Sequence, residues 1–333
     1  MTSVAVVILN YNGRKLLQQF LPTVILYHDT AKVYVVDNGS TDDSLIVLKN
    51  EFPQVTPIAL SENFGFCGGY NRALQQVEED LVVILNSDVE VTPRWLDPMV
   101  RLFDQNPSLG AVQPKILSYH HRKKFEYAGA GGGFVDWLGY PFCRGRVHEW
   151  IEEDVGQYDD VRPVFWASGA CFMVKRDLFI QFGGFDEDFF AHMEEIDFCW
   201  RLNRGGYSVY YCGESHVFHV GGMTLGYENP NKVFLNFRNG LFLIFKNYSS
   251  VELFFKLPLR IFLDGLGGLS FLFTGGAQKF IAVFKAHFLF LFSLNKVFKK
   301  RKETQRMGRT YSRQNIFTGL VVMAYFLKKK PFI

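Results

Sequence analysis

Three carboxylates crowd into four consecutive positions of one short segment. Glu194, Glu195 and Asp197 begin what the sequence predicts as a helix over residues 193–204. A helix N-terminus favours negative charge, because its free N–H groups and its dipole are both positive there. Two interpretations follow. The segment is an acidic first turn that only stabilises the helix, or it supplies a general base and a partner carboxylate at the mouth of an active site.

Charge divides the chain into two parts. The 333 residues are enough for one large domain or two ordinary ones, and many of the 35 phenylalanines lie in the last third. From Leu241 onward, 16 Lys and Arg accompany 3 Asp and Glu, a net charge of +13, whereas residues 1–240 carry 20 and 30, a net charge of −10. We expect the acidic part to hold a cation and the basic part to meet an anionic surface.

The cysteines have neither metal-ligand spacing nor an even count, and they are expected to be buried free thiols in a reducing compartment. They are Cys67, Cys143, Cys171, Cys199 and Cys212. The first apolar run, residues 4–9, is too short for a secretory signal and lacks a basic leader. The sequence therefore predicts a cytosolic protein.

Strand and helix patterns alternate over the first 110 residues. Strands are predicted at 3–9, 31–37, 55–60 and 81–86, and helices at 13–27, 42–50, 69–77 and after Pro93, which is expected at the first helical position. Continuous apolar strands separated by helices indicate a parallel sheet covered on both faces. Such a sheet binds its ligands at the carboxyl ends of the strands.

Polar residues follow all four of these strands. They are Asn10, Tyr11 and Asn12; Asp37, Asn38, Gly39 and Ser40; Glu62, Asn63 and Gly65; and Asn86, Ser87 and Asp88. Four strand ends thus offer carboxylates and amides to one crevice. Asp37 can accept a hydrogen bond from a nucleotide base, or it is a turn or N-cap residue of the DNGS sequence. The glycines from Gly65 to Gly69 precede a helix, where backbone N–H groups can approach phosphate oxygens.

Residues 111–240 lack this regular alternation but show no linker, so we expect them to complete one compact catalytic unit. Strands are predicted at 163–174 and 207–212, with a helix at 175–182 between them. The apolar stretches 253–273 and 280–294 are interrupted by charges and fall short of the ~20 clean residues of a membrane span. We expect them to be amphipathic or re-entrant helices in a cytoplasmic leaflet, with the basic runs 296–306 and 328–330 facing anionic headgroups. The alternative is a helical subdomain packed on the catalytic unit.

Eight motifs occur in an order that resembles a known family. They are NYNG (10–13), VVDNGSTDDS (35–44), NFGFCGGYNRA (63–73), LNSDVEV (85–91), WASGACFMV (166–174), GGFDEDFFAHMEEIDFCWRL (183–202), HVGG (219–222) and FRNGL (237–241). Over residues 2–245 the chain resembles the inverting, nucleotide-sugar-dependent family 2 glycosyltransferases with a GT-A fold. Its motifs are most similar to those of the rhamnosyltransferase-like and galactofuranosyltransferase-like bacterial members that build surface polysaccharides.

The resemblance implies an α/β fold with a Rossmann-like, mostly parallel sheet and helices on both faces. Residues 1–245 would form the catalytic domain, with a nucleotide-binding half at 1–110 and an acceptor half at 111–245. Residues 246–333 would form a membrane-associated helical region. The implied partners are a nucleoside-diphosphate sugar, a glycan or lipid-linked acceptor and an anionic membrane surface, with no nucleic acid. The expected place is the cytoplasmic face of the inner (plasma) membrane, peripheral or monotopic.

The family's metal and base positions map onto single residues here. Asp88 matches the last Asp of the DxD metal motif, whose first position is Asn86 in this chain, and His219 matches the family's histidine; His216 is the competing choice. A divalent ion, Mg²⁺ or Mn²⁺, would neutralise the diphosphate leaving group. The general base maps to Glu195, where the family has Asp. Glu194 competes for that role, and Asp197 is expected to orient the site through Arg201 one turn on.

The remaining site residues implied by the resemblance contact the donor. The residues that would bind the nucleotide sugar at the strand ends are Asn10, Tyr11, Asn12, Asp37, Asn38, Asn63, Gly65, Asn71, Asn86 and Ser87. Trp166, Ser168 and Gly169 would line the sugar pocket, and Arg238 with Asn239 would reach the diphosphate. The loop 129–148 would cover the donor or bind the acceptor.

Two other functional classes compete with an active transferase. The first is a catalytically inactive nucleotide-sugar-binding or assembly subunit on the same scaffold; the retained Asp88, Glu195 and His219 argue against it. The second is a nicotinamide-dependent dehydrogenase, which the NYNG turn disfavours because it lacks the GxGxxG fingerprint. The sequence leaves the donor sugar, the base, the acceptor, the linkage and the oligomeric state open.

Overall fold

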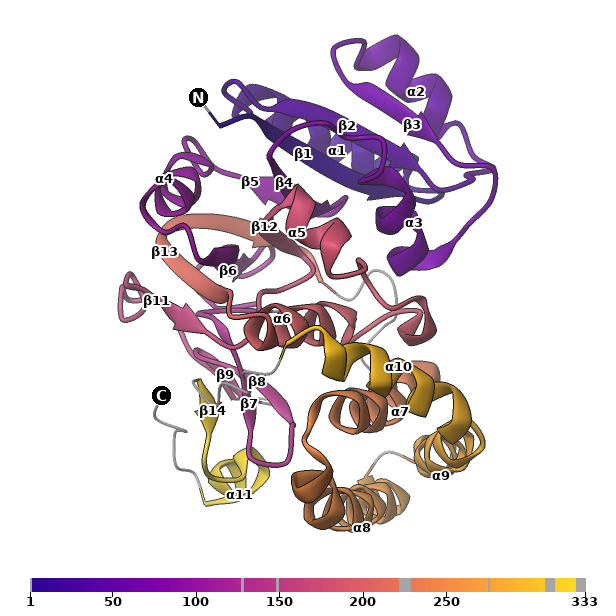
Figure 1. Cartoon of the computed structure of the whole chain (residues 1–333). Coiled ribbons are helices and arrows are strands. Elements are labelled where there is room, and N and C mark those ends of the chain that lie inside the picture. The colour runs from indigo at the N-terminus through magenta and orange to yellow at the C-terminus, as the bar shows by residue number, and fades with distance from the viewer. Residues whose placement is uncertain are drawn as a thin grey trace.

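The computed structural model describes residues 2–126, 129–147, 150–221, 229–274, 276–308 and 315–327. Gly222 of the HVGG motif, residue 148 of the predicted covering loop and the basic run 328–330 lie outside these ranges. Figure 1 shows three parts: a large sheet with its helices, and below it a small sheet at the left and a helical tail at the right.

The large sheet has the strand order β11-β13-β6-β12-β4-β1-β2-β3, with β5 paired to β13. Its strands are β1 (Val4–Asn10), β2 (Lys32–Asp37), β3 (Thr56–Ala59), β4 (Leu81–Asn86), β5 (Val89–Val91), β6 (Leu109–Ser118), β11 (Val161–Val164), β12 (Cys171–Lys175) and β13 (Ser208–His219). The four neighbouring strands β4, β1, β2 and β3 are parallel to one another. β12 is antiparallel to both β4 and β6, so the sheet becomes mixed in its second half.

Alternation along β1 divides the core between the two faces of the sheet. Ala5 and Val7 belong to one buried cluster, and Val6 and Ile8 belong to the other. Successive strand side chains point to opposite faces, so a run of apolar residues requires cover on both. The predicted α/β fold with helices on both faces is confirmed.

Amphipathic helices provide that cover. One face carries α1 (Arg14–Leu26), α2 (Ser44–Glu51) and α4 (Asp97–Gln105), and the other carries α3 (Gly65–Ala73), α5 (Arg176–Gln181) and α6 (Glu194–Arg204), with the short 3-10 turn η1 (Glu187–Phe189) before α6. Within α1 the buried residues Leu17, Phe20, Leu21 and Val24 recur at the spacing of one helix face.

Several sequence predictions about element boundaries are wrong: α3 covers residues 65–73 rather than 69–77, and β13 continues to His219 rather than ending at residue 212. No helix begins at Pro93: Arg94 adopts a φ of +60°, which cannot continue a right-handed helix, and α4 starts at Asp97. The single strand predicted at 163–174 is two strands, because β11 pairs with β13 at the sheet edge whereas β12 lies between β4 and β6. The intervening residues cross from one position to the other.

The small sheet joins distant parts of the chain. Its order is β10-β9-β8-β7-β14, with β7 (Gly133–Asp136), β8 (Pro141–Cys143), β9 (Arg146–Val147), β10 (Trp150–Ile151) and β14 (Ile316–Phe317). β14 pairs in parallel with β7, and the helix that follows it, α11 (Val321–Phe326), is anchored by a hydrogen bond from the Val321 N–H to Asp136, 3.0 Å.

The tail consists of α7 (Pro230–Asn247), α8 (Ser250–Thr274), α9 (Ala277–Phe292) and α10 (Leu294–Arg306). The predicted boundary at residue 245 falls inside α7. This helix packs against α6 on one side and against α8, α9 and α10 on the other, as Figure 1 shows. Phe290 and Val297 of the tail also belong to the same buried cluster as the sheet residues. The tail is therefore built onto the catalytic unit.

Candidate active site

The carboxyl ends of β1 and β2 form the first part of the site. Asn10 and Asp37 are paired in the parallel register, and both are buried. The Asn10 amide donates to Asp37 Oδ1 at 3.2 Å, and Asp37 Oδ2 accepts the N–H of Ser40 at 3.1 Å. The second bond reaches the N–H three residues on and so closes the DNGS turn that the sequence allowed. Asp37 therefore has a structural role here, and a contact with a nucleotide base stays a prediction.

Asn12 links the two loops that follow these strands. Its Oδ1 accepts the N–H of Thr41 at 2.8 Å, and its own N–H donates to Ser40 Oγ at 2.9 Å. The neighbouring Tyr11 is about half exposed. It offers a free aromatic face at this end of the sheet.

The loop before α3 is held by two amides. Asn38 donates to Asn63 Oδ1 and to the Gly65 carbonyl, both at 3.0 Å, and accepts the N–H of Phe64. Gly65 begins the helix with a φ of +70°, a conformation that side chains disfavour. These bonds fix the start of α3, where the phosphate contact was predicted.

The structure brings Asp88 and His219 together and leaves His216 apart. The Asp88 Oδ1 atom lies 3.2 Å from His219 Nε2, and the Asn86 amide lies 3.4 Å from the same nitrogen. Glu126, which the sequence did not single out, lies 3.3 Å from His219 Nδ1. His216 pairs with Lys115 in the β13–β6 register and is exposed.

Two neighbouring carboxylates favour the protonated form of His219. Burial lowers its pKa, but hydrogen bonds and the charges of Asp88 and Glu126 outweigh burial and raise the pKa to about 10. The part of the chain that is described contains no group of three or more His, Cys, Asp or Glu side chains with metal-site geometry. One carboxylate and one imidazole side by side do suit a cation that takes its other ligands from a diphosphate and water. The residues present fit the implied ion.

Glu194 and Glu195 lie on the first turn of α6 with unusual electrostatics. Glu194 is buried, and burial together with the charge of Glu195 raises its pKa well above the ordinary range. Burial also raises the pKa of Glu195, to about 7, although backbone N–H groups partly oppose this. One oxygen of each carboxyl group is buried without a hydrogen-bond partner. A carboxyl group with a pKa near 7 suits a general base at neutral pH.

Asp197 differs from its two neighbours. It is fully buried and accepts hydrogen bonds from Arg201 at 3.0 Å, Lys246 at 2.9 Å and Asn247 at 2.9 Å. Burial would raise the pKa of Asp197, but the charges of Lys246 and Arg201 keep it below its usual value. The predicted Asp197–Arg201 pair is therefore present, and Asp197 joins α6 to α7.

A short series of contacts connects the acidic helix to the metal candidates. A Cβ atom at Gly169 would lie 3.8 Å from Cβ and from Cδ of Glu195. The next residue, Ala170, accepts the N–H of Asn86 at 2.9 Å. Because the Asn86 side chain lies against His219, Glu195 and the Asp88–His219 pair face the same end of the sheet.

Several predicted donor contacts already have partners within the protein. Trp166 donates its indole N–H to the Phe134 carbonyl at 2.8 Å, and Ser168 is fully buried. Asn71 bonds to both backbone groups of Phe185 at 2.8 Å. Arg238 donates to carbonyls of the loop before α6. These side chains hold loops together, while Ser87 stays partly exposed beside Asp88.

Sequence reasoning missed Glu126, Asp186 and Lys246. Lys246 lies 2.5 Å from Asp186 and is almost fully buried, although it looks like an ordinary helix residue in the sequence. No motif marks Glu126 or Lys246, and Asp186 lies in the 183–202 motif without being singled out there. For Lys246, the one signal in the sequence was a charged residue on the apolar face of the segment that forms α7.

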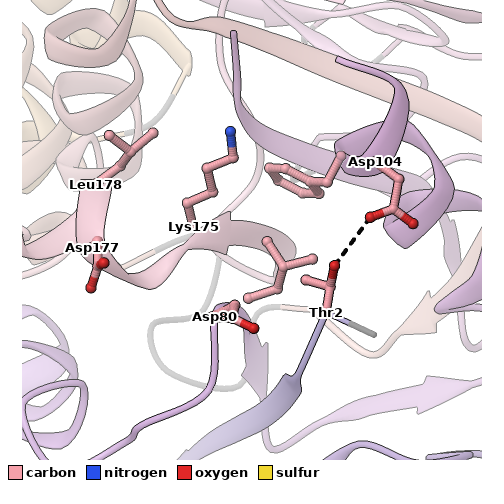
Figure 2. A pocket seen from close by; sticks show the side chains of 8 residues that line it. Thr2, Asp80, Asp104, Lys175, Asp177 and Leu178 are labelled. Atoms are coloured by element: carbon pink, nitrogen blue, oxygen red, sulfur yellow. Dashed lines mark hydrogen bonds between the residues drawn. The ribbon is translucent and has the colours of Figure 1, made fainter. Parts of the chain in front are cut away.

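A pocket of about 330 Å³ lies elsewhere (Figure 2). It is lined by Thr2, Asp80, Lys175 and others around the start of β4, with Thr2 bonded to Asp104. Asn86, at the far end of β4, belongs to the candidate site. This pocket is therefore separate from it.

A Rossmann-like sheet with polar groups at its strand ends, faced by an acidic helix, defines the class of GT-A nucleotide-sugar glycosyltransferases. The sequence model described as glycosyl transferase family 2 matches residues 5–183. The chain belongs to this family, and the resemblance drawn from the eight motifs is confirmed.

Relatives come from polysaccharide and glycan synthesis. The chain is 27% identical over 281 residues to N-acetylglucosaminyl-diphospho-decaprenol L-rhamnosyltransferase of Mycobacterium tuberculosis, covering 78% of this chain and 89% of that protein. It is 24% identical to the low-salt glycan biosynthesis hexosyltransferase Agl10 of Haloferax volcanii, covering 71% and 73%.

Solved structures share the fold at lower identity. GalNAc-T7 with UDP, GalNAc and Mn²⁺ has a TM-score of 0.60 at 13% identity, covering 80% of this chain and 51% of that one, so the chain spans about half of it. The mannosyltransferase PcManGT of Pyrobaculum calidifontis, in complex with GDP-Man and Mn²⁺, has a TM-score of 0.51 at 14% identity, covering 98% and 88%.

Proposed function

We propose that the chain transfers a sugar from a nucleoside diphosphate to a hydroxyl group of a glycan or lipid-linked acceptor, with inversion at the anomeric carbon, in cell-surface polysaccharide synthesis. The observation that carries this is the carboxyl group of Glu195, with its pKa near 7, beside Gly169 and at the same end of the sheet as Asp88 and His219.

Glu195 accepts the proton of the acceptor hydroxyl as its oxygen bonds to the anomeric carbon. The bond to the diphosphate breaks on the opposite face, and its electron pair leaves with the nucleotide. Burial and the charge of Glu195 raise the pKa of Glu194, which favours its protonated form and so lessens the repulsion between the two carboxyl groups.

Asp88 and His219 would hold a divalent ion, Mg²⁺ or Mn²⁺. When bound, the ion supplies positive charge to the departing diphosphate. Asn86 contacts the His219 ring, and Glu126 lies against its other nitrogen, so both orient the imidazole. Tyr11, Asn63, Gly65 and Ser87 are our candidates for contacts with the nucleotide.

We further propose that the tail lies in one leaflet of the membrane, on its cytoplasmic face. By length and composition, α8 could cross a membrane, contrary to the expectation from its charges, and α9 with α10 passes the same test if that bent pair is counted as one span. The charges lie on a single stripe that is buried against the catalytic unit: Arg260 pairs with Asp264 at 3.0 Å, and Asp264 accepts from Tyr140 at 2.6 Å. A helix bonded in this way to the catalytic unit is better suited to lie along its surface than to cross a bilayer.

The other faces of α8 and α9 are apolar and exposed. They include Phe254, Phe255, Phe262, Phe273, Phe284, Phe288 and Phe292. Exposed apolar surface of this extent is typical of a membrane-binding site. The two expectations for the tail are thus compatible: it packs on the catalytic unit with its polar side and leaves its apolar side for lipid.

The test is a thermal-shift screen of nucleotide sugars with and without Mn²⁺ or Mg²⁺, followed by transfer assays with the donors that stabilise the protein. We expect at least one donor to raise the melting temperature only with the ion, and NMR of the product to show inverted anomeric configuration. A product with retained configuration would refute the single displacement. Binding without transfer to any glycan or lipid-linked acceptor would favour the inactive subunit.

A further inference from the structure

The loop between Asp186 and α6 has an unusual backbone. Phe190 has φ +64° and ψ −58°, and the Ala191 N–H donates to the Phe189 carbonyl at 2.7 Å, which is the rare γ-turn with positive φ. His192 and Met193 follow with φ of +69° and +75°. Three non-glycine residues with positive φ in four positions are strained, and such a conformation persists only where its surroundings hold it.

One buried amide holds most of this loop. Asn239 of α7 donates to the carbonyls of Phe189 at 2.9 Å and of Ala191 and His192 at 2.8 Å. Its Oδ1 accepts from Arg238 at 2.9 Å, so the amide itself is oriented. Asn239 is completely buried, and no water can replace these bonds without a rearrangement.

Arg238 secures the same loop from its exposed side. Its Nη2 atom lies 3.0 Å from the carbonyls of Asp188 and Phe189. The start of the loop is fixed separately, because Asp186 accepts from Lys246 and from Lys300 of α10. The loop is therefore held at both ends by the tail.

Glu194 and Glu195 come directly after Met193, so the loop sets where their carboxyl groups lie. We propose that Asn239 is a positioning residue: by holding the strained loop it fixes Glu195 against Gly169, and it contacts no substrate. The inference rests on the proposed function for the role of Glu195, but the contact itself is independent of it.

Asn239→Ala removes the three donated bonds and lets the loop relax. A displacement of about 1 Å at a reacting group costs ~10²-fold in rate, so we expect kcat to fall by that order while the donor KM stays within about threefold. Hydrogen exchange should rise in residues 188–197 and stay unchanged in the β1–β4 sheet. The matched control is Asn203→Ala, which removes one amide-to-carbonyl bond, to Phe165, at the other end of α6. It should keep kcat.

Arg238→Gln is the second variant, for use even if Asn239→Ala does not fold. If Arg238 acts on the loop, kcat falls and binding of UDP, GDP or TDP with Mn²⁺, measured by calorimetry, is unchanged. If it binds the diphosphate instead, nucleotide affinity falls and loop exchange does not change, which would overturn the proposal for this pair.

The proposal is also wrong if Asn239→Ala keeps wild-type kcat and exchange, or if Asn203→Ala loses as much kcat. Should the wild type transfer no sugar at all, the proposed function fails, and the exchange measurement alone decides whether Asn239 holds the loop.

Discussion

The carboxylate of Asp88 lies 3.2 Å from the imidazole of His219, although one residue follows β4 and the other ends β13. The link between them is β5, which follows Asp88 directly and pairs with the end of β13, with Val89 opposite His219. The metal candidates are thus placed by strand pairing, which leaves little freedom in their separation.

Asp88→Asn should abolish Mn²⁺-dependent binding of a nucleoside diphosphate while leaving the fold intact. The amide keeps the shape of the side chain but removes the negative charge that a divalent ion requires. Calorimetry with UDP, GDP and TDP, with and without Mn²⁺, measures this. Asp104→Asn, at the opposite end of the sheet, is the control and should bind normally. Unchanged metal-dependent affinity in Asp88→Asn would remove Asp88 from the site.

Glu195→Gln should lower the transfer rate at least ~10²-fold, the usual scale for a general base, with donor binding retained. Glu194→Gln should cost less, because the raised pKa of Glu194 favours its protonated form, which accepts no proton. The comparison is made by steady-state kinetics under saturating donor. If the two effects are reversed, Glu194 is the base.

The transfer rate should rise as the pH passes through about 7, because burial raises the pKa of Glu195 to that value and only the ionised carboxylate accepts a proton. Below this pH the protonated form predominates, and kcat should fall about tenfold per pH unit. A rate profile flat between pH 5.5 and 8.5 would contradict the assignment.

Lys246→Met should destabilise the protein by about 3–5 kcal/mol, since it leaves the buried carboxylates of Asp186 and Asp197 without their main partner. Lys296→Met is the matched control; its exposed pair with Asp188 should contribute about 0–1 kcal/mol. Both are measured by urea denaturation. The pKa of Asp197 is held below its usual value, so its stabilisation is present above about pH 4 and is lost as the pH falls. The difference in free energy of unfolding between Lys246→Met and Lys296→Met should therefore become smaller in acid.

Phe255→Asp combined with Phe262→Asp should release the protein from anionic vesicles. Both rings are exposed on α8, and a carboxylate on that face opposes insertion and repels anionic headgroups. Co-sedimentation at low and high salt is the measurement. Leu26→Asp, an exposed apolar position of α1, should sediment like the wild type. A wild-type protein that stays in the supernatant would show that the tail does not bind lipid.

The sequence predicted the first half of the fold well, because β1 to β4 form apolar strands that belong to one parallel sheet, in which β1, β2 and β3 follow the order of the chain and β4 lies on the other side of β1. The predictions failed where pairing is distant. Residues 163–174 are all apolar or small, and nothing local shows that the chain must leave the edge strand β11 and re-enter the sheet as β12.

The candidate site was predictable in its residue types but not in its contacts. Asp88, His219 and Glu195 were identified through motifs. The Asp197–Arg201 pair followed from helix spacing. By contrast, Glu126, Lys246 and the Asn239 contacts depend on where α7 crosses the loop before α6, and a helix crossing has no local sequence signal.

The pairing of β14 with β7 has a consequence for biogenesis. β7 leaves the ribosome long before β14, and the Phe-rich helices α8 and α9 are made between them. The small sheet, including the Asp136 carboxylate that receives the Val321 N–H, therefore stays incomplete until those helices have emerged. During synthesis the apolar helices α8 and α9 therefore meet lipid or chaperones before the small sheet is complete. A shortened chain that stops before residue 316 will lack β14, which is a strand of that sheet.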